Sequence, residues 1–387
     1  MEPQKTEKNW YDKSYKLLLL IPAIFFLLTI FYLYNFQAKN GDIIYKDVTL
    51  TGGTTITVFD SSADIEQVKS SLKNEFHDLN VRGLYDFRTS RQTGFILETQ
   101  KNVELIKLAI EKFLGYALNQ ENSSIEFSGA TLSAGFYKQL INSIIVAFLL
   151  MGCVIFFIFG ESRKIKGFAL ILTFAAIFIA LRELSIVKSL SITGVVAGFF
   201  IAIFGSKNKT DYLVTFVITA LTVLIIFSYP SSIIIIILSI ILILIYGFYS
   251  VPSIAVIAAA FADIIMTVAV VDLIGLQLSI AGIVAFLLLI GYSVDTDILL
   301  TNRVFKSREG KINERIFGAF KTGITMTLTA IAAVTISLFI VYKSSEVLRQ
   351  IFTIVFIGLW FDIFNTWITN ASIVKWYAES KEKEARA

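Results

Sequence analysis

Apolar runs of about twenty residues follow one another along most of this chain, and they constrain its fold more than any other feature. A helix needs roughly 17–25 mostly apolar residues to cross a bilayer. Hydrophobic residues make up 56% of the 387 residues, whereas soluble domains reach about 45–50% on a count that includes glycine. The sequence therefore predicts a polytopic α-helical membrane protein. Its ten candidate spans cover residues 17–35, 138–159, 167–181, 190–205, 212–228, 231–249, 251–272, 280–301, 322–342 and 349–370.

The chain has one cysteine, Cys153, and one histidine, His77. A single thiol cannot form a disulfide or a thiolate metal site within one chain. A single imidazole excludes HExxH zinc sites and clusters of histidine ligands. We therefore expect no metal site, no cofactor and no enzyme activity of the common hydrolytic kinds.

Between the first two predicted spans, residues 36–137 are mixed polar and apolar and have about the length of a small domain. Residues 47–60 alternate as a strand does, and residues 61–76 follow with helical periodicity. Two short strand candidates, an amphipathic helix near residues 103–118 and a last strand candidate come next. The order strand–helix–strand–strand–helix–strand predicts a small α+β domain of the ferredoxin-like split βαβ type, with the pattern βαββαβ.

Lysine and arginine in the short loops indicate how the chain is oriented. Basic residues gather before the first predicted span, after the second and fourth spans, and in the linker 303–321, whereas the opposite loops carry few. Basic loops face the cytoplasm, so the tails 1–16 and 373–387 are expected there and the domain 36–137 outside. The cytoplasmic membrane is the expected location. The net charge of +4 is too small to indicate nucleic-acid binding.

Carboxylates inside membrane spans are costly and mark functional sites by default. At 1.5 Å per residue, Asp263, Asp295 and Asp362 lie at neighbouring depths near the middle of three predicted spans. Asp297 follows Asp295 by about 200° of helix rotation, so the two carboxylates face nearly opposite directions. We expect one of the two to be the sensitive group, and we rank Asp295 first. Asp272 is expected near the outer surface.

Polar side chains near these carboxylates offer hydrogen-bond partners. Asn302 shares a helix face with Asp295, and the next span carries Thr322, Thr325 and Thr329 on one face. Hydroxyl groups hydrogen-bond carboxyl groups across helices, and chains of carboxylates relay protons in transporters. The matched depths favour such a relay. The alternatives are that a buried aspartate only holds helices together and that the threonine face is ordinary helix packing.

Several stretches resemble archaeal members of the SecF family, beginning with GYSVDTDILLTNR at residues 291–303. Each stretch alone is weak evidence for this family, but the complete set in this order is specific to it. The others are the glycine motif TGGT, which comprises Thr51, Gly52, Gly53 and Thr54, and residues 251–267, 281–306, 321–330 and 358–377.

This resemblance implies a protein-export subunit of the resistance–nodulation–division superfamily. It implies a six-span core, with its last four spans in residues 251–372, that pairs with a SecD-like subunit. Such a complex assists unfolded preproteins at a SecY-type channel and is thought to use the proton gradient in bacteria. The runner-up is a proton-coupled exporter of small molecules or lipids from the same superfamily, which would carry a duplicated membrane unit. An intramembrane aspartyl protease and a purely structural scaffold are further alternatives.

The chain departs from the family pattern twice. Residues 160–250 read as an insertion of about four spans, and this even number restores the orientation before the core resumes. Asp295 matches the aspartate of the bacterial SecD motif, whereas the bacterial SecF aspartate aligns with Thr296. Met326 stands where the bacterial family has an arginine. A carboxylate–guanidinium switch therefore cannot operate within this chain, and a SecD-like partner would have to supply the missing group.

Overall fold

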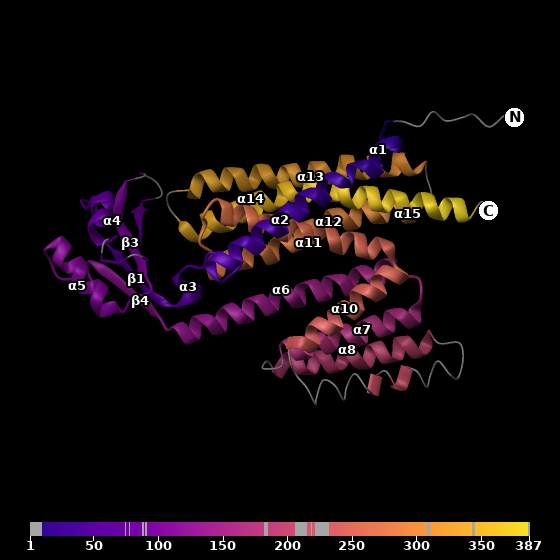
Figure 1. The fold of residues 1–387 in the computed structure, drawn as a ribbon, viewed down its shortest axis with the longest axis horizontal. Helices are drawn as coiled ribbons and strands as arrows, with labels where there is room; N and C mark the ends of the chain where they lie inside the picture. The colour runs from indigo at the N-terminus through magenta and orange to yellow at the C-terminus, as the bar shows by residue number, and fades with distance from the viewer. Residues whose placement is uncertain are drawn as a thin grey trace.

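The computed structural model describes residues 10–385 except for residues 74, 77, 87–88, 90, 182–184, 206–214, 218, 221–231, 308–309 and 343–344. Figure 1 shows a bundle of long helices with a small domain of strands and short helices at one end. Within these described residues, six helices are long and apolar enough to cross a membrane, and they confirm the predicted six-span core. They cover Ser14–Asn40, Ala130–Phe159, Val251–Leu273, Ile280–Lys306, Ile312–Val341 and Glu346–Glu384.

The helices of the bundle have clear starting points in the sequence. Ser279 and Ser345 cap α12 and α14, because each side chain accepts a hydrogen bond from a backbone N–H three residues later. The last span extends beyond its predicted end, since the helix continues into the charged segment that follows it. The bundle consists of α1 (Trp10–Leu18), α2 (Leu20–Asn40), α6 (Ala130–Phe159), α11 (Val251–Leu273), α12 (Ile280–Lys306), α13 (Ile312–Val341), α14 (Glu346–Phe364), the π-helix η1 (Asn365–Asn370) and α15 (Ala371–Glu384).

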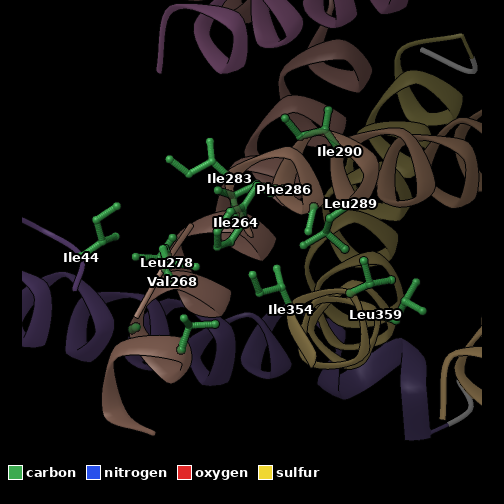
Figure 2. Packing of buried hydrophobic residues seen from close by; sticks show 14 of the residues in the cluster. Ile44, Ile264, Val268, Leu278, Ile283, Phe286, Leu289, Ile290, Ile354 and Leu359 are labelled. Carbon is green, nitrogen blue, oxygen red and sulfur yellow. The ribbon is translucent and has the colours of Figure 1, made fainter. Parts of the chain in front are cut away.

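Two layers of apolar side chains fill the bundle. The outer layer lies in the half nearest the small domain, where Figure 2 shows Ile264, Ile283 and Phe286 close together beside Leu289 and Ile354. The inner layer lies in the half nearest α1 and the end of α15. It is built from Ala255, Leu300, Val304, Ile312, Ile316, Ala319, Ala371, Val374 and Ala378. Because lipid tails are as apolar as these side chains, close packing rather than water exclusion holds the layers together.

The contact between α12 and α14 depends on Gly358. A Cβ atom at this position would lie 2.2 Å from the side chain of Leu289, which is fully buried. We expect Gly358→Ala to lower the free energy of unfolding by about 1–3 kcal/mol, because the added methyl group overpacks this contact. Gly291→Ala on α12 is the matched control, since its Cβ would meet nothing within 4 Å. Denaturant unfolding of both variants in detergent checks this, and equal stabilities would contradict it.

The small domain has the predicted βαββαβ order. Its four strands form one sheet in the order β2-β3-β1-β4, and neighbouring strands are antiparallel. Ile56 in the middle of β1 pairs with Leu97 on one side and Ile125 on the other. Ile106 and Ile110 pack beneath the sheet and are fully buried. The elements are β1 (Gly53–Val58), α4 (Ile65–Lys73), β2 (Asn80–Tyr85), β3 (Gln92–Thr99), α5 (Val103–Leu114) and β4 (Ser123–Ser128).

The first predicted strand begins later than its alternating pattern indicated. Residues 48–51 form a helical turn, α3 (Val48–Thr51), because the side chain of Asp47 accepts a hydrogen bond from the backbone N–H of Thr49 at 2.9 Å. A capping carboxylate of this kind favours a helical start over a strand. The alternating pattern therefore corresponds to a strand only from Gly53 onward.

The predicted insertion contributes three described helices, α7 (Arg163–Ala180), α8 (Ser185–Phe204) and α10 (Ser232–Tyr249). Figure 1 shows them beside α6, away from α13 and α14. None of these three is among the six helices that meet the criteria for a span. The predicted span 212–228 falls mainly outside the described residues. Four inserted spans therefore remain a prediction.

The two predicted tails meet as helices at the end of the bundle opposite the small domain. Lys375 on α15 is fully buried and forms an ion pair with Asp12 on α1. Its ammonium group also donates to Asn313 on α13 at 2.6 Å and lies 4.9 Å from the ring centroid of Tyr15. Three helices from distant parts of the sequence are thus joined at one buried charge.

Candidate functional site

Three buried carboxylates from three helices meet between the two apolar layers. Asp263 lies on α11, Asp297 on α12 and Asp362 on α14. Asp263 and Asp297 are fully buried and Asp362 is 1% exposed. At 1.5 Å per residue, Asp263 lies about 18 Å from the start of α11 and Asp297 about 26 Å from the start of α12. We refer to these three side chains as the carboxylate cluster.

Asp263 has a partner for each carboxylate oxygen. The hydroxyl of Ser293 on α12 donates to Oδ2 at 2.5 Å, and the amide of Asn365 in η1 donates to Oδ1 at 2.7 Å. Both donors are buried. Asp263 therefore joins α11 to α12 and to η1 through hydrogen bonds in the middle of the bundle.

Asp362 is surrounded by threonine hydroxyls. Thr296 on α12 donates to its Oδ1 at 2.9 Å, and Thr327 on α13 lies 3.4 Å from its Oδ2. Thr366 in η1 lies 3.2 Å from Oδ1 of Asp362 and 2.9 Å from Oδ1 of Asp297. The hydroxyl of Thr366 thus lies between two carboxylates and links them.

Asp297 is the least satisfied member of the carboxylate cluster. Its Oδ1 accepts from Thr366 and, at 2.7 Å, from the amide of Asn370. Its Oδ2 has no hydrogen-bond partner among the described residues, and neither has Oδ1 of Asn370. A buried carboxylate that keeps its charge needs full pairing. Asp297 is therefore the member of the cluster that has room for a further hydrogen-bond donor.

The π-helix η1 supplies three of the polar side chains around the carboxylate cluster. Its i→i+5 turns widen the helix, so Asn365 and Asn370, five residues apart, both reach the cluster. Short π-helical segments inside α-helices are frequent at functional sites. A regular α-helix would rotate five residues by about 500° and turn one of the two amides away.

Asp295, which the sequence analysis ranked first, does not lie in the buried cluster with Asp263 and Asp362. Asp295 is exposed on the surface of the bundle, and Asp297 takes the buried place. The expected rotation between the two was right, but the direction of the helix face was not. The buried face of α12 carries Ser293, Thr296 and Asp297. This run of small polar residues, each one turn from Leu289 or Leu300, is the signal that could have identified it.

The predicted supporting face is also exposed. Asn302 on α12 and Thr322, Thr325 and Thr329 on α13 lie on the outside of the described bundle. The missed threonine is Thr327, which is 3% exposed and faces Asp362. We call Asp295, Asn302, Thr322, Thr325 and Thr329 the polar face. Met326, which stands where the bacterial family has an arginine, lies beside these threonines and is 49% exposed. This position is therefore on the outside of the described bundle, away from the carboxylate cluster.

Two further features named from the sequence, Asp272 and the TGGT motif, lie outside the carboxylate cluster. Asp272 lies near the end of α11 as expected, but its side chain is buried, at 3% exposed. In the TGGT motif, Gly52 has φ +83° and packs so closely on α6 that a Cβ would lie 2.5 Å from Ala130. Gly53 packs on Thr99 in the same way, and Thr54 donates to the carbonyl of Lys101 at 2.7 Å. The motif joins the sheet to the second span, and Thr51 ends the helical turn before it.

The chemistry that this arrangement supports is proton exchange. Its donors are neutral hydroxyl and amide groups, and among the described residues no lysine or arginine forms an ion pair with the carboxylate cluster. The described residues contain no group of three or more histidine, cysteine, aspartate or glutamate side chains that could hold a metal ion. Neighbouring carboxylates in a low dielectric cannot all stay charged, so such a cluster shares protons.

Comparison with known proteins identifies the family of this chain. The family model for the C-terminal part of the protein-export membrane proteins SecD and SecF matches residues 208–380. SecF from Methanocaldococcus jannaschii is 30% identical over 374 residues, which are 94% of this chain and 96% of the relative. SecF from Methanolacinia petrolearia is 48% identical over 135 residues, and that from Methanothermobacter thermautotrophicus is 50% identical over 133 residues. These two matches span about half of each relative, 47% and 46%, and about a third of this chain.

A solved structure supports the fold. The crystal structure of SecDF, a translocon-associated membrane protein from Thermus thermophilus, superposes with a TM-score of 0.53 at 13% identity. The match covers 97% of this chain and 40% of that protein. At this identity the likeness shows the fold alone. The similarity to the Methanocaldococcus protein over nearly the whole length of both chains shows the family: the chain belongs to the SecF family of multi-pass protein-export membrane proteins.

Proposed function

We propose that this chain is an auxiliary subunit of the Sec protein translocase. It lies in the cytoplasmic membrane with both termini in the cytoplasm, and it acts with a SecD-like subunit to assist unfolded preproteins at a SecY-type channel. It is not an enzyme in this role. Its task is to couple proton movement to translocation. The observation that carries this proposal is the carboxylate cluster, buried at mid-membrane depth in a chain of this family.

Thr366 is the centre of the proposed coupling step. A threonine hydroxyl has one proton to donate, and its two acceptors, Asp297 and Asp362, lie 2.9 and 3.2 Å away. When one carboxylate takes up a proton, the hydroxyl of Thr366 donates its hydrogen bond to the other carboxylate. Each protonation change therefore reassigns a hydrogen bond between α12 and the α14–η1 helix. That reassignment is the local event that moves one helix against the other.

The polar face supports a SecD-like partner. Asp295 lies about 22 Å from the start of α12, which is inside the span, and the described residues give its carboxylate no hydrogen-bond or ion-pair partner. A carboxylate at this depth facing lipid is costly. Arg303 on the same helix donates to Thr322 at 3.3 Å, so the exposed sides of α12 and α13 meet at this point. A second subunit that covers this face would remove the cost and supply the missing cation.

Co-isolation tests the partner directly. Thr329→Trp places a large ring on the polar face, and we expect at least tenfold less SecD-like subunit to co-purify with it than with the wild-type chain. Ile240→Trp on α10 is the matched control, since Ile240 is 52% exposed on the other side of the bundle. Equal recovery of the partner with both variants would contradict the proposed interface.

Export in living cells tests the function as a whole. In cells depleted of this protein, a secreted reporter is expected to accumulate as its precursor, and the wild-type chain should restore export. Export at the normal rate in depleted cells would refute the proposed function. Accumulation of a small toxic molecule or a lipid without any export defect would instead favour a small-molecule or lipid exporter.

A further inference from the structure

An apolar cavity of about 550 Å³ lies between the core of the bundle and the inserted helix α10. Its wall is formed by α6, α10, α11, α12 and the loop after α2. Ile144 and Phe148 come from α6, Ile257 and Phe261 from α11, and Leu242 from α10. The volume falls within the roughly 300–1,000 Å³ of cavities that hold small ligands. The cavity is distinct from the carboxylate cluster, none of whose members lines it.

The wall is nearly devoid of polar groups. Three lining side chains carry hydroxyls, and two of these are already engaged: Ser239 donates to the carbonyl of Ile235 at 2.8 Å, and Tyr137 lies 3.3 Å from Asp42. The third, Tyr246, packs its ring 4.9 Å from that of Phe156. A buried water needs about two to four polar partners. The cavity therefore suits hydrocarbon rather than water.

The size of the cavity suits a narrow ligand better than a polypeptide. A helix about 10 Å across would fill 550 Å³ within roughly 7 Å of its length, which is about five residues. An extended peptide would leave its backbone N–H and C=O groups unpaired against this wall. A hydrocarbon chain has neither problem, because it is narrow, flexible and free of polar atoms.

One end of the cavity lies beside a charged group. Tyr137 and Ile43 line this end, and the ammonium group of Lys46 lies 4.2 Å from the ring centroid of Tyr137. Lys46 is 23% exposed and forms an ion pair with Asp42. A lysine at the border of an apolar cavity matches the phosphate of a lipid whose chain lies inside.

We propose that this cavity binds one hydrocarbon chain of a membrane phospholipid, with the phosphate headgroup at Lys46. The lipid fills the space between the SecF-like core and the insertion, so it fastens α10 to α6 and α11. The proposal goes beyond the export function and gives the inserted helices a role that the family resemblance does not supply.

Native mass spectrometry of the full-length chain tests this proposal. The chain is placed in bilayers of phosphatidylglycerol and phosphatidylcholine at a ratio of about one to three and is then extracted into mild detergent. We expect the wild-type chain to retain one phospholipid. Ala258→Trp, at an exposed position that lines the cavity, should reduce the retained fraction at least tenfold. Ile240→Trp on the outside of α10 should retain lipid as the wild-type chain does.

Further variants separate the parts of the proposal. Lys46→Gln is expected to remove any preference for phosphatidylglycerol over phosphatidylcholine while leaving a lipid bound. If Ala258→Trp does not fold, Ala258→Leu fills less of the cavity and should reduce retention in the same direction. Equal retention by the wild-type chain and by the cavity-filling variant that folds would overturn the proposal. Loss of every lipid from the wild-type chain in mild detergent would overturn it as well.

Discussion

Asp297→Asn is expected to reduce export of a secreted reporter at least tenfold while the chain stays folded. The asparagine oxygen can still accept from Thr366 and Asn370, which bond Oδ1 of Asp297 at 2.9 and 2.7 Å. Its amide takes the place of the carboxylate oxygen that has no partner. The side chain then resembles a permanently protonated aspartate, which can neither release nor take up a proton. Export rates in depleted cells, with protein levels measured in parallel, provide the test.

The control for this experiment is Asp272→Asn. Asp272 is also a buried aspartate on a membrane helix, at 3% exposed, but it lies near the end of α11 and outside the carboxylate cluster. We expect this variant to export the reporter at the wild-type rate. If Asp297→Asn also exports normally, the cluster is a hydrogen-bonded packing device, and the search for the coupling group moves to the polar face and to the partner.

Asp12→Ala is expected to destabilise the chain by about 3 kcal/mol, because it removes the nearest carboxylate from a buried charge. Lys375 would keep its hydrogen bond to Asn313 and a carboxylate of Glu379 at 3.8 Å, which places the cost at the lower end of the range for broken buried pairs. Lys375→Met should cost less, since it removes the buried charge itself and leaves Asp12 partly exposed, at 21%. Denaturant unfolding of the purified chain measures both.

A double-mutant cycle shows whether the two side chains act together. Asp12→Ala with Lys375→Met should be more stable than Asp12→Ala alone, because no buried ammonium group is left without its partner. Additive effects of the two substitutions would contradict the idea that this contact fastens α1 to α15. The cycle also separates the fold from the function, since neither residue belongs to the carboxylate cluster.

Much of the fold follows from patterns that are read over many residues. Apolar runs of twenty residues indicate spans whichever way each helix is rotated. The βαββαβ domain is recognisable because its strands alternate and its helices have one apolar stripe, as Ile106 and Ile110 show. The failure at residues 48–51 has a local cause. One capping aspartate outweighs an alternating pattern only four residues long.

The candidate site was harder to predict because it depends on the rotation of single helices. Asp295 and Asp297 are the same residue type and lie at nearly the same depth, so composition and depth cannot choose between them. Ser293 and Thr296 determine which aspartate is buried, because their small side chains allow α12 to approach its neighbours on the side of Asp297. The π turn at Asn365 has no signature in a single sequence, so the amides that complete the site were not expected.

The position of the carboxylate cluster between two apolar layers has a consequence for ion movement. Both layers are built from apolar side chains, which cannot relay a proton, so the proton coupling that we propose requires a helix movement that gives protons access to the cluster. We call each of the two layers a gate, because it separates the carboxylate cluster from one surface of the bundle. Each gate is a packed set of helices, the outer one around Phe286 and the inner one around Leu300. In the proposed function, proton transfer requires that one gate opens while the other stays closed, and a proton leak would require both gates to open at once.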